Sequence, residues 1–389
     1  MKHRISRSFL TSTVVVISIG LAVSVGVSAQ EKQQGSGPGH KANMIVFDAP
    51  GAGTDTYQGT YAFSINQEGA IAGDYEDANN VYHGFLRTPD GTFIESNQAA
   101  CSTGAPVVSI NPAGTLTGFC ADGSNVIHAY LRTRDGRLTS FDAPGAGTGP
   151  GQGTFSGYFA SINPAGTSTG DYLDASNVYH GYVRTRNGRI TTFDAPGAGT
   201  GPFQGTVGGL FDGGGGGLNP AGTIVGDFLD SSTVYHGFVR APDGDITVFD
   251  APGAGTGPWQ GTTGSGINPA GVIVGYHVDA SSVAHGYVRS PGGRITTFDA
   301  PGAGTGLWQG TYALGINPQG TIVGYYLDAN YAYHGFIRDT RGNITTVDAP
   351  GAGTGAYQGT NLFSVNPAGL MVGEFLAVNN IWHGLLVIP

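Results

Sequence analysis

The sequence predicts an all-β protein, a seven-bladed β-propeller whose blades are four-stranded antiparallel sheets. Three observations support this fold class. A repeat of about 49 residues recurs seven times along the chain. Each copy divides into four short apolar runs separated by turn signals. The N-terminal part of the chain supplies one strand and the C-terminal part three strands of the same copy. This arrangement closes a ring and would serve no purpose in a linear array.

An Asn followed 17 residues later by a His marks every copy of the repeat. Successive His residues are 45, 52, 56, 49, 49 and 49 positions apart. All the variation in length therefore falls between one Asn–His module and the next. The seven pairs are Asn66/His83, Asn111/His128, Asn163/His180, Asn219/His236, Asn268/His285, Asn317/His334 and Asn366/His383.

The copy that begins at Thr311 shows the four predicted strands most clearly. The first strand ends in Asn-Pro-Gln-Gly, where Pro suits the second position of a type I turn and Gly the left-handed position that follows. The second covers residues 321–327 and ends in an Asx-type turn at Asp328. The third covers residues 333–338, and the fourth, 344–347, leads into a long Gly-rich crossover. Four such strands per repeat are typical of a propeller blade.

The chain ends provide an independent indication of closure. The seventh copy stops at Pro389 after three predicted strands. Residues 44–48 (MIVFD), from Met44 to Asp48, match the fourth strand of the other copies, such as residues 295–299 (ITTFD). We therefore expect the N-terminal strand to complete and close the last blade.

Two segments precede the predicted propeller domain, residues 44–389. Residues 1–29 have the features of a signal peptide: a basic start, an apolar stretch and small residues before a predicted cleavage site after Ala29. Residues 30–43 are polar and low in complexity, so we expect a flexible leader. The sequence thus predicts a secreted or periplasmic protein with no membrane insertion after signal cleavage.

The composition supports a β-rich fold and excludes one class of partner. The chain has 69 Gly residues and only 11% charged residues. Without the signal peptide it carries 14 Lys and Arg against 27 Asp and Glu, a net charge of −13. Such an acidic chain repels phosphate backbones, so we expect no nucleic-acid partner.

The pattern I-N-P-x-G-x-x-x-G, followed by Y-H-G-F, resembles the HAF repeat of bacterial exported proteins. This resemblance covers nearly all of residues 44–389. It implies a bacterial, exported, propeller-like protein and carries no general biochemical role. Most copies here have Gly after the His, and only His128 is followed by Ala.

The seven repeated His residues lie on the third predicted strand of each blade, away from the central axis. They cannot converge on one ion, so we expect structural hydrogen bonds and no metal site. Six copies also have an Asp six residues before the His and an Arg four residues after it; the seventh has Ala377 and Val387. We interpret these groups as an ion-pair or turn-capping network, and we predict no catalytic residue.

The crossovers share the sequence D-A-P-G-A-G-T-G-x-aromatic-Q-G-T. Strand direction puts them on one face with the Asp turns. A ring beside an amide can stack on a sugar and bond its hydroxyls, and repeated weak sites add avidity. Alternatively, each ring packs on the neighbouring blade and each Gln satisfies loop backbone groups. The candidate ligand-binding residues are Tyr57, Gln58, Phe203, Gln204, Trp259, Gln260, Trp308, Gln309, Tyr357 and Gln358.

Three irregularities interrupt the repeat. Gln152 follows Gly151 instead of an aromatic residue, and the second crossover, residues 98–106, has lost the motif. Cys101 and Cys120 are a candidate disulfide in an exported protein, worth about 3 kcal/mol; the alternative is two small buried residues. A Gly-rich insertion beside Asp212 marks the longest interval.

Three functions remain open from the sequence. The first is a non-catalytic binding or scaffold protein that recognises a glycan or an extracellular protein through the crossover face. The second is a hydrolase or lyase acting on a polysaccharide, which needs an asymmetric cluster; Asp212 is the visible candidate, and Ca²⁺ is a possible cofactor. The third is a structural surface component. Fold alone does not decide between them.

Overall fold

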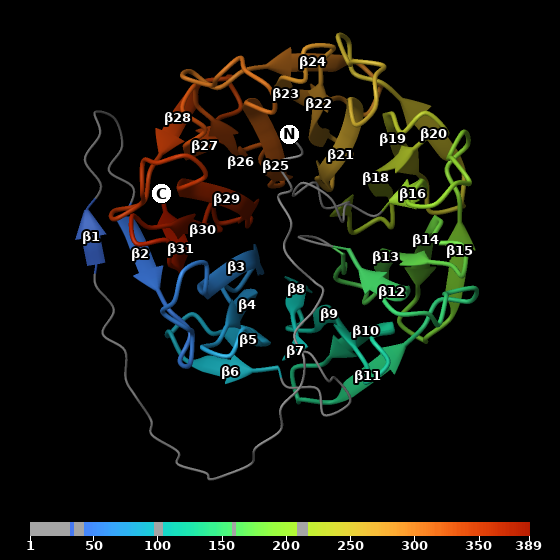
Figure 1. Ribbon diagram of the computed structural model, residues 1–389, viewed down its shortest axis with the longest axis horizontal. Helices are drawn as coiled ribbons and strands as arrows, with labels where there is room; N and C mark the ends of the chain where they lie inside the picture. Colours follow the sequence, from blue (N-terminus) through green and yellow to red (C-terminus); the bar gives the residue numbers. More distant parts are fainter. Residues whose placement is uncertain (1–31, 35–42, 97–103, 158–160, 208–216) are drawn as a thin grey trace.

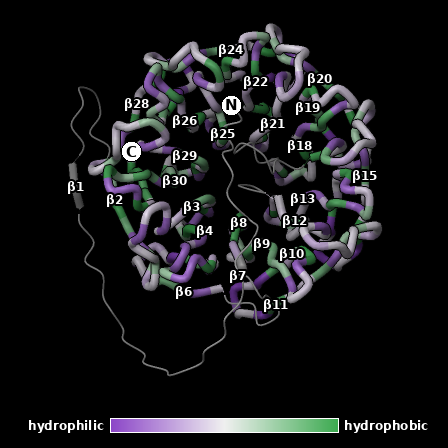
Figure 2. Tube along the Cα trace, in the orientation of Figure 1, coloured by the Kyte–Doolittle hydropathy of each residue, from purple (hydrophilic) through white to green (hydrophobic). Residues whose placement is uncertain are grey.

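The computed structural model describes residues 32–34, 43–96, 104–157, 161–207 and 217–389. These residues form seven β-sheet blades arranged around a central axis (Figure 1). Hydrophobic stretches recur in every blade (Figure 2). The described part of the chain contains no helix that could cross a membrane. The predicted all-β propeller is therefore confirmed.

Each blade is built from consecutive strands that pair antiparallel, and the first strand of a blade is the innermost. Blade 1 comprises β3 Gly59–Ile65, β4 Ile71–Glu76, β5 Tyr82–Arg87 and β6 Phe93–Glu95. Blade 2 comprises β7 Gly104–Ala105, β8 Val107–Ile110, β9 Leu116–Ala121, β10 Ile127–Arg132 and β11 Leu138–Phe141. Blade 3 comprises β12 Gly153–Ser156, β13 Ser168–Leu173, β14 Tyr179–Arg184 and β15 Ile190–Phe193. Blades 4 and 5 comprise β16 Gly205–Val207, β17 Gly217–Leu218, β18 Ile224–Leu229, β19 Tyr235–Arg240, β20 Ile246–Phe249; and β21 Gly261–Ile267, β22 Ile273–Val278, β23 Ala284–Arg289, β24 Ile295–Phe298. Blades 6 and 7 comprise β25 Gly310–Ile316, β26 Ile322–Leu327, β27 Tyr333–Arg338, β28 Ile344–Val347; and β29 Gly359–Val365, β30 Met371–Leu376, β31 Trp382–Ile388, with β2 Asn43–Phe47.

The predicted turns form the hairpins. In blade 6 the Gly320 N–H donates to the Asn317 carbonyl at 3.0 Å, and Gly320 has a φ of +92°, a conformation that favours Gly. In the next turn the Asp328 carboxylate accepts the N–H groups of Asn330 and Ala332. These two local devices set the lengths of the strands on either side.

The N-terminal strand completes the seventh blade as predicted. β2 pairs antiparallel with β31, with Met44 opposite Val387. The third strand of one blade also pairs in parallel with the first strand of the next over one or two residues, and the Gly59–Trp382 bridge repeats this contact where the ring closes. Within the expected leader, β1 Lys32–Gln34 pairs with the outer edge of β2.

A closed ring of Asn side chains joins the seven blades. Each repeated Asn lies buried in its first hairpin turn and donates from Nδ2 to the carbonyl of the equivalent Asn in the next blade, at 3.0–3.5 Å. The last bond, from Asn366 to the Asn66 carbonyl, returns to blade 1. Because a buried amide costs free energy when it is unpaired, this ring of bonds stabilises the closed arrangement of the seven blades.

Candidate functional site

The repeated His residues form a hydrogen-bonded seam near the crossover loops. In six blades the His Nδ1 lies 2.8–2.9 Å from the Asp that begins the DAP sequence. Five of these rings, those in blades 3 to 7, also stack on an aromatic ring of the second strand, as His334 does on Tyr326 with centroids 4.9 Å apart. The six pairs are His128–Asp142, His180–Asp194, His236–Asp250, His285–Asp299, His334–Asp348 and His383–Asp48.

The structural hydrogen bonds expected of the His residues run to two carboxylates of the same blade. The shorter contact of six His residues is to the DAP Asp. The reason is register: Gly286 pairs with Phe298, which brings the following Asp299 opposite His285. The turn Asp lies farther from Nε2, at 3.6–3.8 Å, in five blades.

The first and seventh blades depart from this arrangement. In blade 1, His83 uses Nε2 to bond the turn residue Asp77 at 3.1 Å. In blade 7, Ala377 replaces the turn Asp, so His383 has only the carboxylate of Asp48. Asp48 follows the N-terminal strand, so this bond also ties the two ends of the chain together. All these rings keep 22–28% of their side chain exposed, as partly buried structural groups do.

The carboxylates around His334 favour its protonated form. The hydrogen bond that His334 donates to the Asp348 carboxylate raises the pKa of His334 above its ordinary value, and partial burial opposes this rise. The carboxylates of one blade satisfy its own His, and the structure brings no two of these seven His residues together. Among the described residues, no group of three metal-ligating side chains converges.

The repeated Arg residues contact aromatic rings, not the ion-pair partners we expected. Five guanidinium groups lie 4.7–5.0 Å from the centroid of a Phe ring on the preceding blade, as Arg338 does over Phe298. At the boundary between blades 6 and 7, Val387 stands in place of the Arg and Val347 in place of the Phe, and the two side chains belong to one apolar cluster. The turn Asp residues do cap turns, so the Asp and Arg groups act separately.

The candidate Gln residues hold the crossover loops in shape. Gln309 Oε1 accepts the N–H of Gly306 at 2.8 Å, and the equivalent amide of Gln358 also donates to Asn380 at 2.7 Å on the next blade. A Cβ on Gly304 would clash with Gln309 Oε1, which explains the Gly at that place in the motif. Gln309 is only 4% exposed. The structure thus commits the candidate amides largely to the loop.

Other parts of the motif also have internal partners. The N–H of the motif Ala bonds a buried Thr Oγ1, as between Ala300 and Thr311 at 2.9 Å. The Gly before that Thr makes the parallel bridge to the preceding blade, and a Cβ on Gly310 would clash with the Ala284 carbonyl oxygen. The DAP Asp bonds the His. In the described loops, the aromatic side chain takes no part in these backbone bonds, although it contacts a second ring at some positions, as Trp259 does with Tyr235.

The five candidate rings are partly exposed and lie on a backbone of left-handed conformation. Their exposed fractions run from 37% to 58%. Each has a left-handed φ between 60° and 68°, a region that bulky residues rarely occupy. Each backbone N–H donates to a carbonyl of the preceding blade at 2.6–2.7 Å, which holds that conformation. The five residues are Tyr57, Phe203, Trp259, Trp308 and Tyr357.

These rings, which we call the ring residues, dominate the exposed apolar surface. The described chain has eight exposed large hydrophobic residues, and seven belong to crossover loops or Asp-type turns of the same face. Leu307 and Val378 join the ring residues there, and sequence reasoning missed both. The signal for Leu307 was present, since it replaces the Pro found before Trp259.

The same face is acidic at its outer rim. The six DAP Asp side chains that bond His are each 49–55% exposed. Tyr235 packs beside Trp259 with centroids 6.3 Å apart, and Tyr331 lies 5.6 Å from Tyr357. The crossover face therefore combines exposed rings, carboxylates and, at some positions, a second ring.

Two sequence predictions fall partly outside the described residues. Cys120 is buried in β9, and no described cysteine is a free thiol, but Cys101 lies outside the described residues. The Cys101–Cys120 disulfide therefore stays a prediction. Asp212 and most of its Gly-rich insertion also lie outside them, as does the predicted signal peptide.

Comparison with solved structures defines the class: the chain shares its fold with seven-bladed propellers. It resembles virginiamycin B lyase from Staphylococcus aureus with a TM-score of 0.55 and 14% identity, over 89% of this chain and 100% of that chain. It also resembles a streptogramin B lyase, with a TM-score of 0.54, 12% identity and coverage of 88% and 98%. At these identities the likeness shows the fold alone. No protein-family profile matches the sequence, and no curated protein sequence matches it.

Proposed function

We propose that the chain is an exported, non-catalytic binding propeller that recognises carbohydrate through repeated ring sites on its crossover face. One observation carries the proposal. Five bulky aromatic residues occupy a left-handed backbone position with their rings exposed, where the sixth loop has Gly151 with a φ of +78°. The resemblance to HAF repeats agrees with export but assigns no ligand.

The backbone position itself gives no reason for an aromatic residue. An L-residue in the left-handed region costs about 1–2 kcal/mol, and Gly avoids that cost. Gly151 shows that the loop closes without a ring, because its N–H makes the same bond, to the Asn125 carbonyl at 2.7 Å. Five exposed aromatic residues thus keep an unfavourable backbone conformation that Gly would avoid, which indicates that the rings contact something other than the protein itself.

A ring of this kind suits the apolar face of a sugar. Stacking uses the ring, while the carboxylates of the rim can accept sugar hydroxyls. Each site is small and open, so we expect weak binding to one sugar and tighter binding to a polymer that spans several loops. The acidic rim favours neutral or cationic glycans over anionic ones on this face. The Gln residues, whose amides bond the loop, then act by shaping the loop rather than by touching the ligand.

The test is a binding screen with the purified protein against soluble oligosaccharides and insoluble polysaccharides, with and without Ca²⁺. We expect one class of polysaccharide to bind, and Trp259→Ala/Trp308→Ala to weaken that binding at least tenfold while the far-UV spectrum stays unchanged. Ile94→Ala is the matched control, since Ile94 is exposed at 39% but lies on an outer strand.

A gain-of-function variant makes the test sharper. Gly151→Trp supplies the missing sixth ring on a loop that already has the required backbone. It should increase avidity for the same polysaccharide by several-fold. If no glycan binds the folded protein, or if Gly151→Trp and the double Ala variant both leave binding unchanged, the ring sites are not carbohydrate sites. A protein-binding scaffold then becomes the better hypothesis.

A further inference from the structure

The arginines of the propeller are distributed unevenly. Residues 44–389 contain 12 Arg and no Lys, and six of these Arg lie in two copies of the sequence R-T-R-x-G-R. The copies occupy residues 132–137 in blade 2 and 184–189 in blade 3. The other four copies of this turn have Pro or Thr at the place of the second Arg. An acidic protein thus concentrates its cations on two neighbouring blades.

Both sequences form the same tight turn between the third and fourth strands. The Gly136 N–H donates to the Thr133 carbonyl at 2.8 Å, and Gly188 repeats this bond to Thr185 at 2.8 Å. This turn lies on the face opposite the crossover loops, because strand direction alternates within a blade. We call the face that carries these hairpins the turn face.

The two turns carry exposed arginines on neighbouring blades. Arg184 of blade 3 lies 4.7 Å from the Phe141 ring of β11, so strands that flank these two turns are in contact. The stem of Arg134 lies beside Gly114, where a Cβ would be 3.5 Å from its Cβ and Cδ atoms. Its side chain is 73% exposed. The cationic ends therefore stay in water while the stems rest on the first hairpin of the blade.

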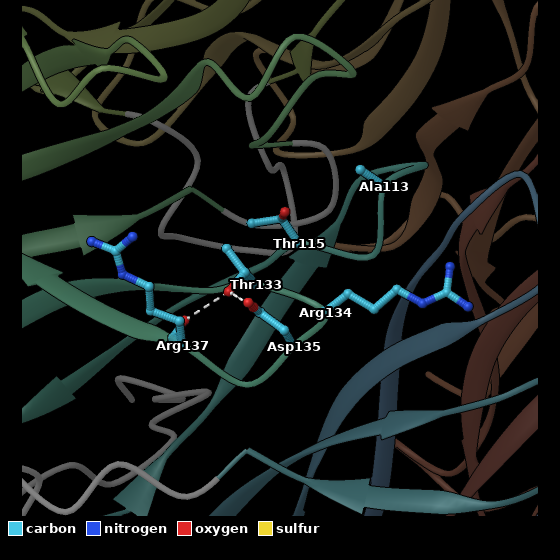
Figure 3. Close-up of a pocket in the computed structure, with 6 residues that line it drawn as sticks. All are labelled: Ala113, Thr115, Thr133, Arg134, Asp135 and Arg137. Carbon is cyan, nitrogen blue, oxygen red and sulfur yellow. Dashed lines mark hydrogen bonds between the residues drawn. The ribbon is translucent and has the colours of Figure 1, made fainter.

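The surface beside the blade 2 turn is hollowed. Thr133 and Asp135 line this hollow, from which Arg134 and Arg137 extend in opposite directions (Figure 3). Arg134 also lies 3.8 Å from Glu68 of blade 1, an exposed pair of little strength. Blade 3 has Asn187 where blade 2 has Asp135, so its two tip arginines face no acid within their turn.

We propose that this sector of the turn face binds a carboxylate-bearing polysaccharide, through Arg134 and Arg137 of blade 2 and Arg186 and Arg189 of blade 3. Guanidinium groups bind carboxylates with two parallel hydrogen bonds, which a Lys ammonium cannot do. The rest of the chain is acidic and repels densely charged polymers. A polymer with one carboxylate per sugar meets less of that repulsion than a nucleic acid, whose charges are closely spaced.

The experiment measures binding of the full protein to polygalacturonate at low salt by microcalorimetry or affinity electrophoresis. Dextran serves as the uncharged polymer and duplex DNA as the phosphate polymer. Arg186→Ala/Arg189→Ala should weaken polygalacturonate binding at least fivefold. The control Arg294→Ala/Arg341→Ala removes the same charge from single exposed arginines of the same turn in blades 5 and 6 and should change binding less than twofold.

Two further comparisons make the outcome decisive. Asp135→Asn converts the blade 2 turn to the blade 3 sequence and should tighten binding by about twofold to threefold by removing a nearby negative charge. Trp259→Ala/Trp308→Ala should leave polygalacturonate binding unchanged, which separates this site from the ring sites. Absence of polygalacturonate binding, equal loss in the two double Arg variants, or tighter binding to DNA than to polygalacturonate would each overturn the proposal.

Discussion

Substitution of Gly151 measures the backbone strain on which the proposed ring sites depend. A Cβ built on this residue has nothing within 4 Å, so Gly151→Ala changes the conformational preference and no packing contact. The left-handed φ of +78° costs an Ala about 1–2 kcal/mol, while the stiffer unfolded chain returns about 0.4–1 kcal/mol. We therefore expect Gly151→Ala to lower the free energy of unfolding by about 1 kcal/mol.

Gly123 provides the matched control. A Cβ on Gly123 also has nothing within 4 Å, and its φ lies outside the left-handed region. Gly123→Ala should therefore be neutral or stabilise the protein by up to about 1 kcal/mol. The same reasoning predicts that Trp308→Gly is more stable than Trp308→Ala, the reverse of the usual order.

Urea-induced unfolding followed by tryptophan fluorescence and circular dichroism gives the comparison. The midpoint is more sensitive than the melting temperature, because a domain of this size shifts by only about 1–2 °C per kcal/mol. If Gly151→Ala is as stable as Gly123→Ala, the ring position carries no strain. The argument from strain to function would then fail, even if the rings bind sugar for another reason.

Three further predictions concern the seams between strands and blades. Burial lowers the pKa of His277 to about 4, so the protein should lose about 3 kcal/mol of stability as the pH falls from 6.5 to 4, because folding opposes the protonation of His277. His277→Tyr should not show this loss. Asn317→Ala should cost about 2–4 kcal/mol at pH 7, since it removes the bond to the Asn366 carbonyl and leaves buried groups unpaired. Asp348→Asn should lower the pKa of His334 and reduce the stability that is lost as the pH rises through that pKa, because the hydrogen bond to Asp348 is the largest cause of the raised pKa; NMR titration can follow the change.

Each of these predictions has a control within the repeat. Tyr75 and Tyr326 occupy the place of His277 and stack on their own His, so Tyr fits that site. An acid-sensitivity that persists in His277→Tyr would assign it to other groups. Asn343, exposed in the outer hairpin of the same blade, is the control for Asn317; equal effects of the two Ala variants would deny the Asn ring a special role. For Asp348→Asn, an unchanged His334 titration would contradict the hydrogen bond as its cause.

The strands were predictable because every turn carries local chemistry. In blade 6 the third and fourth strands begin and end at the predicted residues, and β26 starts one residue later than expected. Pro and Gly in one turn and Asp in the next act within four residues, which a sequence displays directly. Closure by β2 was predictable for the same reason, because a missing strand at one end matched a spare strand at the other.

The contacts between blades were not predictable from local chemistry. Arg338 was expected to bond an acid, yet its partner is Phe298, 40 positions earlier and on another blade. One signal was available: blade 7 lacks the Arg, and blade 6 lacks the Phe at Val347 that such an Arg would cover. The left-handed φ of the ring residues left no signal, because an aromatic side chain argues against that conformation.

The repeat and its departures carry different information. Groups present in every blade, such as the Asn ring, satisfy buried polar atoms and fix the architecture. Gly151 stands where the other loops have an aromatic residue, and its loop keeps the same backbone bond. The arginines of blades 2 and 3 add charge to turns that form in other blades without it. A fold secured by the repeated contacts tolerates both changes at little cost, so its two faces can diverge independently. The crossover face is apolar and acidic and the turn face locally basic, and this difference predicts two ligands of opposite charge preference.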